Sequence, residues 1–343
     1  LRAVVAGQYR LGDAVTEPVL SLRNVHKSFG PVEVLHGVDL DIRAGETHCL
    51  VGESGSGKSV TSLTAMGLLP KDALEIQGGS IDLEGIEITQ AKPAQMRALR
   101  ARRIAMIFQE PMTALNPVLR VGEQIEEVLN MHSDLSRAEA KARTIDMMEQ
   151  VHLPDVERIY AAFPHQLSGG QRQRIMIAMA LSCEPKLIIA DEPTTALDVT
   201  IQAQILELMK DLTKRLGASL IIITHNLGVV ARYADRVNVM YAGRIIEMGT
   251  AQDIYHNPRH PYTLALLKSV PRMDLPRQDK LDPIEGQPPD LTRLDGGCSF
   301  RPRCRYAKDS CAHSFPELEA VDEGHFVACF EKDDLKEKER VAS

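Results

Sequence analysis

An octapeptide near the start of the chain restricts its possible folds more than any other feature. It runs Gly52-Glu53-Ser54-Gly55-Ser56-Gly57-Lys58-Ser59 and matches the pattern G-x-x-x-x-G-K-[ST]. Backbone N–H groups of such a loop wrap a phosphate, and glycines allow the close approach and the positive backbone angles that this needs. The lysine supplies a cation for the β- and γ-phosphates, and the last hydroxyl can bind Mg²⁺. The octapeptide therefore predicts a nucleoside triphosphate site.

The residues on either side of the octapeptide fit this interpretation. Cys49–Val51 is apolar and predicts a strand, and the run from Val60 to Leu69 predicts a helix. In a strand–loop–helix unit the phosphates lie at the positive N-terminus of the helix. We therefore expect residues 52–60 to contact the nucleotide. The alternative is a chance glycine-rich turn, and each of the later motifs counts against it.

Composition narrows the class of protein. The chain has 343 residues, of which 44% are apolar, enough for one large domain or two ordinary ones. A formal net charge of −7 argues against binding nucleic acid through bulk positive charge. We find no run of about 18 apolar residues, so we expect no transmembrane helix. The first residues also lack the apolar core of a secretory signal.

Three apolar runs end at polar residues that could carry chemistry: Arg103–Phe108 before Gln109, Leu187–Ala190 before Asp191 and Glu192, and Ser219–Thr224 before His225. Buried strands alternating with helices predict an α/β fold with a largely parallel sheet covered on both faces. A strand-terminal aspartate in such an enzyme holds Mg²⁺, and the next carboxylate can accept a proton from the attacking water. His225 could contact the γ-phosphate, although a lone histidine there is more often structural.

Other regions have different textures. Val19–Val25 and Val38–Ile42 alternate as two strands, and Gly79–Leu83 with Ile86–Thr89 predicts a small antiparallel sheet. Apolar residues spaced as on a helix face begin at Val121, and Ser136 with Glu139 forms a capping box, so we expect a mostly helical insertion. Phe29 could stack on adenine, with ordinary core packing as the alternative.

A second glycine-containing motif opens a later helix. Leu167-Ser168-Gly169-Gly170-Gln171 frees the backbone at a helix N-terminus and so predicts a second phosphate cradle. A second phosphate cradle on the same chain has a use if that cradle contacts the nucleotide bound by another chain. We therefore expect this segment to act in trans.

Together these motifs resemble, in order, those of the nucleotide-binding subunits of ABC transporters. The resemblance covers roughly residues 19–255 and includes the stacking aromatic Phe29, the Walker A loop Gly52–Ser59, the Q-loop Gln109, the signature Leu167–Gln171, the Walker B strand Leu187–Asp191, the catalytic Glu192, the D-loop Thr195–Asp198 and the switch His225. It implies an ATPase with a RecA-like core, an antiparallel β subdomain and a helical subdomain.

The resemblance also implies roles for individual residues. ATP would be sandwiched between one subunit's Walker A loop and the partner's Ser168–Gln171, with Mg²⁺ held through Ser59, Gln109 and Asp191. Glu192 would act as the base and His225 would sense the γ-phosphate. Gln109 would link the site to membrane subunits, and Asp198 would belong to the D-loop.

A narrower resemblance concerns the cargo. The segments Phe108–Pro117, Asp191–Gln204 and His260–Thr263 are similar to those of ATPase subunits from dipeptide, oligopeptide and nickel importers. Such subunits pair with a second, paralogous ATPase, two membrane permeases and an external solute-binding protein, on the cytoplasmic face of a bacterial inner membrane. Importers of glutathione, opines and antimicrobial peptides look alike, so the cargo stays open between these and peptides.

The motifs and the residue composition divide the chain into segments. We expect an N-terminal extension at 1–17, an ATPase domain at 18–255 with its helical subdomain at about 115–170, a loop-rich extension at 256–330, and a polar tail at 331–343. Two rival functions remain: an ABC-type ATPase acting on nucleic acid or ribosomes, and a redox sensor with a secondary ATPase. No long heptad run or second cassette supports the first, and we expect no nucleic-acid partner.

Cysteine usage is uneven. The last fifth of the chain holds four of the six cysteines: Cys298, Cys304, Cys311 and Cys329. With 5, 6 and 17 residues between successive cysteines, the spacing does not match the close pairs of zinc sites, and a cytosolic ATPase disfavours disulfides. The importer resemblance implies a [4Fe–4S] cluster, favoured by the charges of Arg301, Arg303 and Arg305, with zinc and free thiols as alternatives. Cys49 and Cys183 are expected to pack as small apolar residues.

Overall fold

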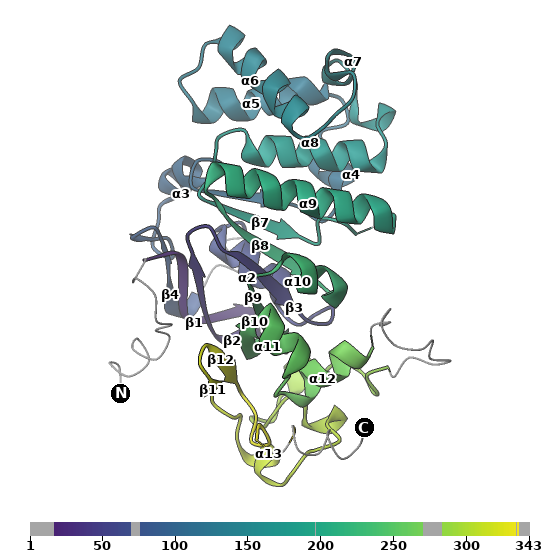
Figure 1. Cartoon of the computed structure of the whole chain (residues 1–343). Helices are drawn as coiled ribbons and strands as arrows, with labels where there is room; N and C mark the ends of the chain where they lie inside the picture. The colour runs from purple at the N-terminus through teal and green to yellow at the C-terminus, as the bar shows by residue number, and fades with distance from the viewer. Residues whose placement is uncertain (1–16, 70–75, 196, 270–282, 334, 336–343) are drawn as a thin grey trace.

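The computed structural model describes residues 17–69, 76–195, 197–269, 283–333 and 335. Two sheets and a layer of helices make up the described part (Figure 1). Among its helices none has the length and apolarity needed to cross a bilayer. The predicted extension at 1–17 and the tail at 331–343 lie mostly outside the described residues.

The larger sheet has eight strands in the order β11-β12-β10-β9-β3-β8-β7-β6. Its strands are β3 (Thr47–Val51), β6 (Ile104–Ile107), β7 (Leu187–Asp191), β8 (Ser219–Thr224), β9 (Arg236–Tyr241), β10 (Arg244–Thr250), β11 (Glu319–Asp322) and β12 (His325–Val327). The strands β9, β3, β8, β7 and β6 are parallel to one another, whereas β10, β12 and β11 pair antiparallel. The expectation of a largely parallel central sheet is confirmed.

The strands β7 and β8 are apolar except at their ends, because both faces of the sheet are buried there. Successive side chains point to opposite faces, so Ile188 and Ala190 join the core beneath the helices while Leu187 and Ile189 join the core beneath the smaller sheet. β8 follows the same rule. A strand buried on one face would have alternated with polar residues instead.

The smaller sheet forms the antiparallel subdomain. It has the order β2-β1-β4-β5, with β1 (Pro18–Phe29), β2 (Val32–Arg43), β4 (Ile76–Leu83) and β5 (Ile86–Glu87). β1 and β2 are joined through Gly30-Pro31, as expected, but each extends several residues beyond its predicted ends. Register shifts along β1 interrupt the alternation there, and this hides the outer parts of the strands from the sequence pattern.

Twelve α-helices fall within the described residues. They are α2 (Lys58–Ala65), α3 (Pro93–Leu99), α4 (Pro111–Ala114), α5 (Val121–His132), α6 (Arg137–Gln150), α7 (Val156–Tyr160), α8 (Gly169–Leu181), α9 (Val199–Leu216), α10 (Leu227–Tyr233), α11 (Ala251–His256), α12 (Pro261–Lys268) and α13 (Ser310–His313), with 3₁₀ turns at Pro164–Gln166, Leu291–Arg293 and Arg301–Arg303. α5 to α8 lie together at the top of Figure 1, above α9 and the sheet.

Helix ends follow local chemistry. The Ser136 hydroxyl accepts the Glu139 N–H and the Glu139 carboxylate accepts the Ser136 N–H, which is the expected capping box of α6. Asp198 caps α9, and Gly217 ends it in the left-handed conformation. Local chemistry therefore accounts for both ends of α9.

The C-terminal part is more than a loop-rich appendage. Its strands β11 and β12 extend the large sheet beside β10, with Glu247 paired to Val327 and Met248 to Phe326. The sequence pattern predicts no strand here, because runs of four and three residues are too short to show a period. The extension is thus joined to the rest of the large sheet through backbone hydrogen bonds between β12 and β10.

Candidate functional site

The phosphate loop lies between β3 and α2, as the sequence predicts. Gly57 has a φ of 105° and occupies the N-cap position of α2. A Cβ atom on Gly52 would lie 2.2 Å from the carbonyl oxygen of Met240 in β9. Only glycine lets the loop approach a neighbouring strand this closely.

Lys58 occupies the centre of the loop. Its ammonium group donates to the carbonyl oxygens of Gly52 and Glu53, each at 2.8 Å. Burial lowers the pKa of Lys58, and the nearby carboxylates of Glu192 and Asp191 oppose that shift. The Ser56 hydroxyl is a third, longer contact at 3.4 Å, and a buried cation held by these neutral oxygens is placed to exchange them for phosphate oxygens.

Two of the expected magnesium residues meet beside this lysine. The Ser59 hydroxyl donates to Asp191 Oδ1 at 3.1 Å. Burial raises the pKa of Asp191, because its carboxylate has lost much of its water. A hydroxyl and a carboxylate at one point are oxygen ligands of the kind that Mg²⁺ takes, so these residues fit the ion.

Glu192 is the residue on which the polar contacts converge. It accepts from Gln109 Nε2 at 2.9 Å and from the Thr195 hydroxyl at 2.9 Å, and it lies 3.2 Å from His225 Nδ1. Burial raises its pKa, but hydrogen bonds from His225 and Thr195 outweigh burial and the net shift is downward. Its carboxylate is therefore ionised and fixed, as a proton acceptor requires.

The backbone at Glu192 is unusual. Its φ of 45° lies in the left-handed region, which non-glycine residues enter rarely. The Glu192 N–H donates to the Ile223 carbonyl at 2.9 Å, so pairing with β8 holds the residue there. Strain of this kind occurs at functional sites and here aims the carboxylate beyond the strand end.

The structure places Gln109 differently from Ser59 and Asp191. Its amide reaches Glu192, not the Ser59–Asp191 pair. The role of Gln109 as a magnesium ligand remains a prediction. The same contact still joins the segment after β6 to the Glu192 carboxylate.

The signature segment begins α8. Ser168 is the N-cap of this helix. Its hydroxyl oxygen accepts the Gln171 N–H, and the Gln171 side-chain oxygen accepts the Ser168 N–H. A Cβ on Gly170 would lie 3.2 Å from Ile201 of α9. α8 belongs to the helical layer at the top of Figure 1, whereas α2 lies among the strands below it. The two expected phosphate cradles thus sit in different layers of the chain.

The remaining expected site residues are placed as follows. Phe29 is half-buried at the end of β1, with Lys27 Nζ 5.7 Å from its ring centre. Val60 is half-buried and packs against the core beneath the smaller sheet. Asp198 accepts the Ile201 N–H at 3.0 Å. No contact here tests adenine stacking or the D-loop role.

Three residues that contact the site were not predicted from the sequence to belong to it. Thr195 bonds Glu192, Tyr262 accepts the Glu53 N–H, and Arg303 pairs with the Glu53 carboxylate. Thr195 lay inside the D-loop motif and could have been chosen by its proximity to Glu192. The other two come from the extension, and no local pattern connects them to the loop.

The four C-terminal cysteines come within electrostatic range of one another. Burial, and then the neighbouring thiols, raise the pKa of Cys304 to about 11 and that of Cys329 to about 12. Cys298, Cys304 and Cys329 each accept a backbone N–H from the residue two positions later. Among the described residues, however, no three His, Cys, Asp or Glu side chains are grouped to hold a metal ion.

The other two cysteines behave as expected. Cys49 is fully buried in the core, and burial raises its pKa. Cys183 is half-buried against the same core. Both pack as apolar residues.

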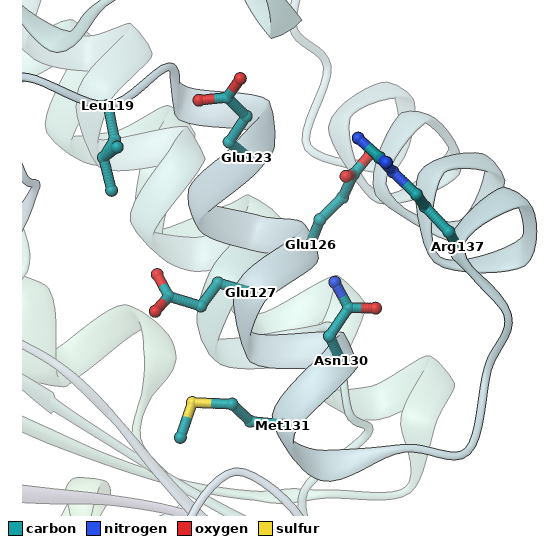
Figure 2. Close-up of a pocket in the computed structure, with 7 residues that line it drawn as sticks. All are labelled: Leu119, Glu123, Glu126, Glu127, Asn130, Met131 and Arg137. Atoms are coloured by element: carbon teal, nitrogen blue, oxygen red, sulfur yellow. The ribbon is translucent and has the colours of Figure 1, made fainter.

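An open pocket of about 550 Å³ lies away from the phosphate loop, on α5. It is lined by Leu119, Glu123, Glu126, Glu127, Asn130, Met131 and Arg137. Leu119, Glu127 and Met131 project to the same side of the chain (Figure 2). Between Gln109 and α5 along the chain lie further exposed apolar side chains, among them Val118 at 75% exposed and Met112 at 53%.

Two family models match the chain. The model described as ABC transporter matches residues 35–195, and the model described as oligopeptide/dipeptide transporter, C-terminal region, matches residues 246–311. The first range holds the phosphate loop, the signature and Glu192. The second holds Tyr262, Arg303 and three of the four C-terminal cysteines.

Curated relatives and solved structures agree with these models. The dipeptide transport ATP-binding protein DppD of Bacillus subtilis is 49% identical over 94% of this chain and 97% of its own. The oligopeptide transport ATP-binding protein OppD of Salmonella typhimurium is 49% identical over 88% of this chain and 89% of its own. The post-hydrolysis dimer of the ATP-binding cassette MJ0796 with ADP and Pi is 28% identical, with a TM-score of 0.60, covering 68% of this chain and 98% of that one.

Proposed function

This chain belongs to the ABC transporter family of ATPases, and we propose that it is the ATP-hydrolysing motor subunit of an importer for di- or oligopeptides. The peptide transport relatives at about half identity support this cargo. One observation carries the catalytic part: Glu192 is fixed by Gln109, Thr195 and His225 beside the phosphate loop.

The reaction is phosphoryl transfer from ATP to water. A water oxygen forms a bond to the γ-phosphorus, the bond to the β,γ-bridging oxygen breaks, and Glu192 accepts the proton of the attacking water. Lys58 and the loop N–H groups hold the β- and γ-phosphates in line. His225 reports the γ-phosphate to Glu192 through their shared contact.

Ser59 and Asp191 would hold Mg²⁺, with Gln109 completing the set. The ion would neutralise charge on the β- and γ-phosphates. The Ser59–Asp191 hydrogen bond supports this assignment, because it already places two oxygen ligands together.

Hydrolysis requires a second ATPase subunit, in this proposal a paralogue. Ser168–Gln171 of one chain would close over the nucleotide that the other chain's phosphate loop holds. The placement of the two cradles in different layers supports closure between chains (Figure 1). Asp198 would lie at that interface.

As an ABC importer ATPase the chain works with membrane permease subunits. We infer that there are two permeases and an external solute-binding protein, and that the chain lies on the cytoplasmic face of the inner membrane. The exposed apolar residues between Gln109 and α5, with the pocket of Figure 2, offer the permeases a docking surface. Cysteine cross-links from Met131 to a permease would check this contact, and cross-links found only from other faces would contradict it.

The four C-terminal cysteines are proposed to hold a [4Fe–4S] cluster. Backbone N–H groups aimed at three of the sulfur atoms would stabilise thiolates. Each thiolate would bind a different iron, so convergence on one point is not needed, whereas a single zinc ion requires it. The cluster would support the fold of the extension, and ATP hydrolysis has no step that uses it.

Anaerobic purification tests this site. We expect a brown chain with broad visible absorption and about four irons per chain, and bleaching in Cys304→Ser. A colourless chain with stoichiometric zinc would contradict the cluster and leave the ATPase proposal intact.

Replacing the catalytic carboxylate tests the ATPase itself. Glu192→Gln keeps the shape and removes the proton acceptor, so turnover in the assembled transporter should fall by about 100-fold or more while ATP still binds. Glu207→Gln, on the exposed face of α9, is the control. Unchanged turnover in Glu192→Gln would refute the assignment.

A further inference from the structure

The C-terminal extension forms hydrogen bonds with Glu53 of the phosphate loop. The Glu53 N–H donates to the Tyr262 hydroxyl oxygen at 2.8 Å. Its carboxylate accepts both arms of the Arg303 guanidinium, at 2.6 Å and 3.0 Å. Its carbonyl accepts from Lys58 at 2.8 Å. Every polar group of this loop residue is therefore engaged, two of them by the extension.

Arg303 is held rigidly. Only 4% of its side chain is exposed. Besides the fork on Glu53, its Nε donates to the Glu285 carbonyl at 2.9 Å and Nη1 reaches the Tyr241 hydroxyl at 3.3 Å. A two-armed guanidinium–carboxylate pair fixes direction as well as distance. Arg303 therefore sets where the Glu53 side chain points.

An aromatic cluster supports both groups. The Phe300 ring centre lies 5.3 Å from that of Tyr241 and 5.4 Å from that of Tyr262, both edge-on. The Arg303 guanidinium lies 5.9 Å from the same ring. Phe300 is itself 3% exposed, so the cluster is a packed part of the core. Packing within this cluster thus restricts the positions of Tyr262 and Arg303.

We infer that Tyr262 and Arg303 are positioning residues for ATP, acting through Glu53 to hold the phosphate loop in its binding shape. Two effects follow from their geometry. They anchor the loop residue whose carbonyl carries Lys58. Arg303 also neutralises a carboxylate that would otherwise face the phosphates of ATP and repel them.

This inference rests on the proposed ATPase function and extends it to the C-terminal region. Cys298 and Cys304 bracket the turn that carries Phe300 and Arg303, and the Cys304 N–H bonds the Arg301 carbonyl at 3.1 Å. The cysteine site and the Arg303 contact to Glu53 therefore share one short turn.

Nucleotide affinity of the full chain tests the inference. Arg303→Met removes the fork and keeps the length of the side chain, so we expect the Kd for a fluorescent ATP analogue with Mg²⁺ to rise roughly tenfold. The matched control is Arg305→Met. Arg305 is 69% exposed and its 3.3 Å pair with Glu285 does not reach the loop, so its Kd should stay within about twofold.

A double-variant cycle separates positioning from folding. Glu53→Gln in the Arg303→Met background removes the carboxylate charge that the first change leaves unpaired. The loss of ATP affinity in the double variant should therefore be smaller than the sum of the losses in the two single variants. In the assembled transporter Arg303→Met should raise KM for ATP while kcat stays within about twofold. A purely structural role would instead lower the amount of folded chain and leave KM unchanged.

The outcomes are distinct. Equal Kd values for Arg303→Met and Arg305→Met would overturn the inference. If Arg303→Met does not fold, Tyr262→Phe decides, because it removes one hydroxyl; a Kd weakened by about threefold supports the inference, and an unchanged Kd overturns it. Failure of the unaltered chain to bind ATP would instead contradict the proposed function.

Discussion

At the scale of single residues, the site depends on backbone positions that few side chains tolerate. Glu192 adopts a φ of 45° at the end of β7, and Gly52 approaches a neighbouring carbonyl too closely for any Cβ. The sequence motifs identify both residues but say nothing of these angles and distances. The structure supplies the reason for each.

Gly52→Ala tests the close approach. The added Cβ would lie 2.2 Å from the Met240 carbonyl oxygen, so the loop must shift away from β9. We expect ATP affinity to fall by about tenfold or more. Gly45→Ala is the control, since Gly45 also has a positive φ but has nothing within 4 Å of its added Cβ. Equal ATP affinities in the two variants would contradict this explanation.

His260 links stability to pH. It caps α12 by accepting the Tyr262 N–H at 3.0 Å, and burial lowers its pKa to about 3. The unfolded chain takes up this proton below about pH 6.5, whereas the folded chain stays neutral until about pH 3. The stabilisation is therefore complete above pH 6.5 and is lost as the pH falls toward 3, at about 1.4 kcal/mol per unit.

Urea unfolding at pH 7.5 and 5.5 measures this dependence. His260→Asn keeps a helix cap without a titrating group, and its unfolding free energy should fall less steeply between the two values. The difference between the chains removes the contribution of other titrating groups. Identical slopes would show that His260 does not remain neutral in the folded chain.

At the scale of elements, prediction succeeded where a strand or helix carries its own signal. The apolar runs in β7 and β8 predicted these strands, and the capping box of Ser136 and Glu139 predicted the start of α6. β11 and β12 have no such signal, because their places depend on pairing with β10. Backbone partners that lie far along the chain are invisible to local patterns.

The same limit applies to the site. Lys58, Asp191, Glu192 and His225 were each predicted from motifs, and the structure brings them together. Tyr262 and Arg303 were not, because their role depends on folding the extension back onto the loop. Arg303 was noted only for its charge beside the cysteines. Contacts across more than two hundred residues require the fold.

At the scale of the whole molecule, the two proposed halves of the catalytic site lie in different layers of the chain. The phosphate loop lies among the strands, and the signature opens a helix of the upper layer (Figure 1). A second ATPase subunit would complete each half. The extension adds a third surface, where Tyr262 and Arg303 form hydrogen bonds with Glu53 of the phosphate loop.

The most direct test of this arrangement is the ATP turnover of the assembled transporter with Ser168→Arg. The bulky cation at the N-cap of α8 would block closure over the nucleotide of the opposite subunit. We predict that turnover falls by about 100-fold or more, while the isolated variant binds ATP as tightly as the unaltered chain. Turnover at the unaltered rate would contradict the claim that hydrolysis needs both halves to meet.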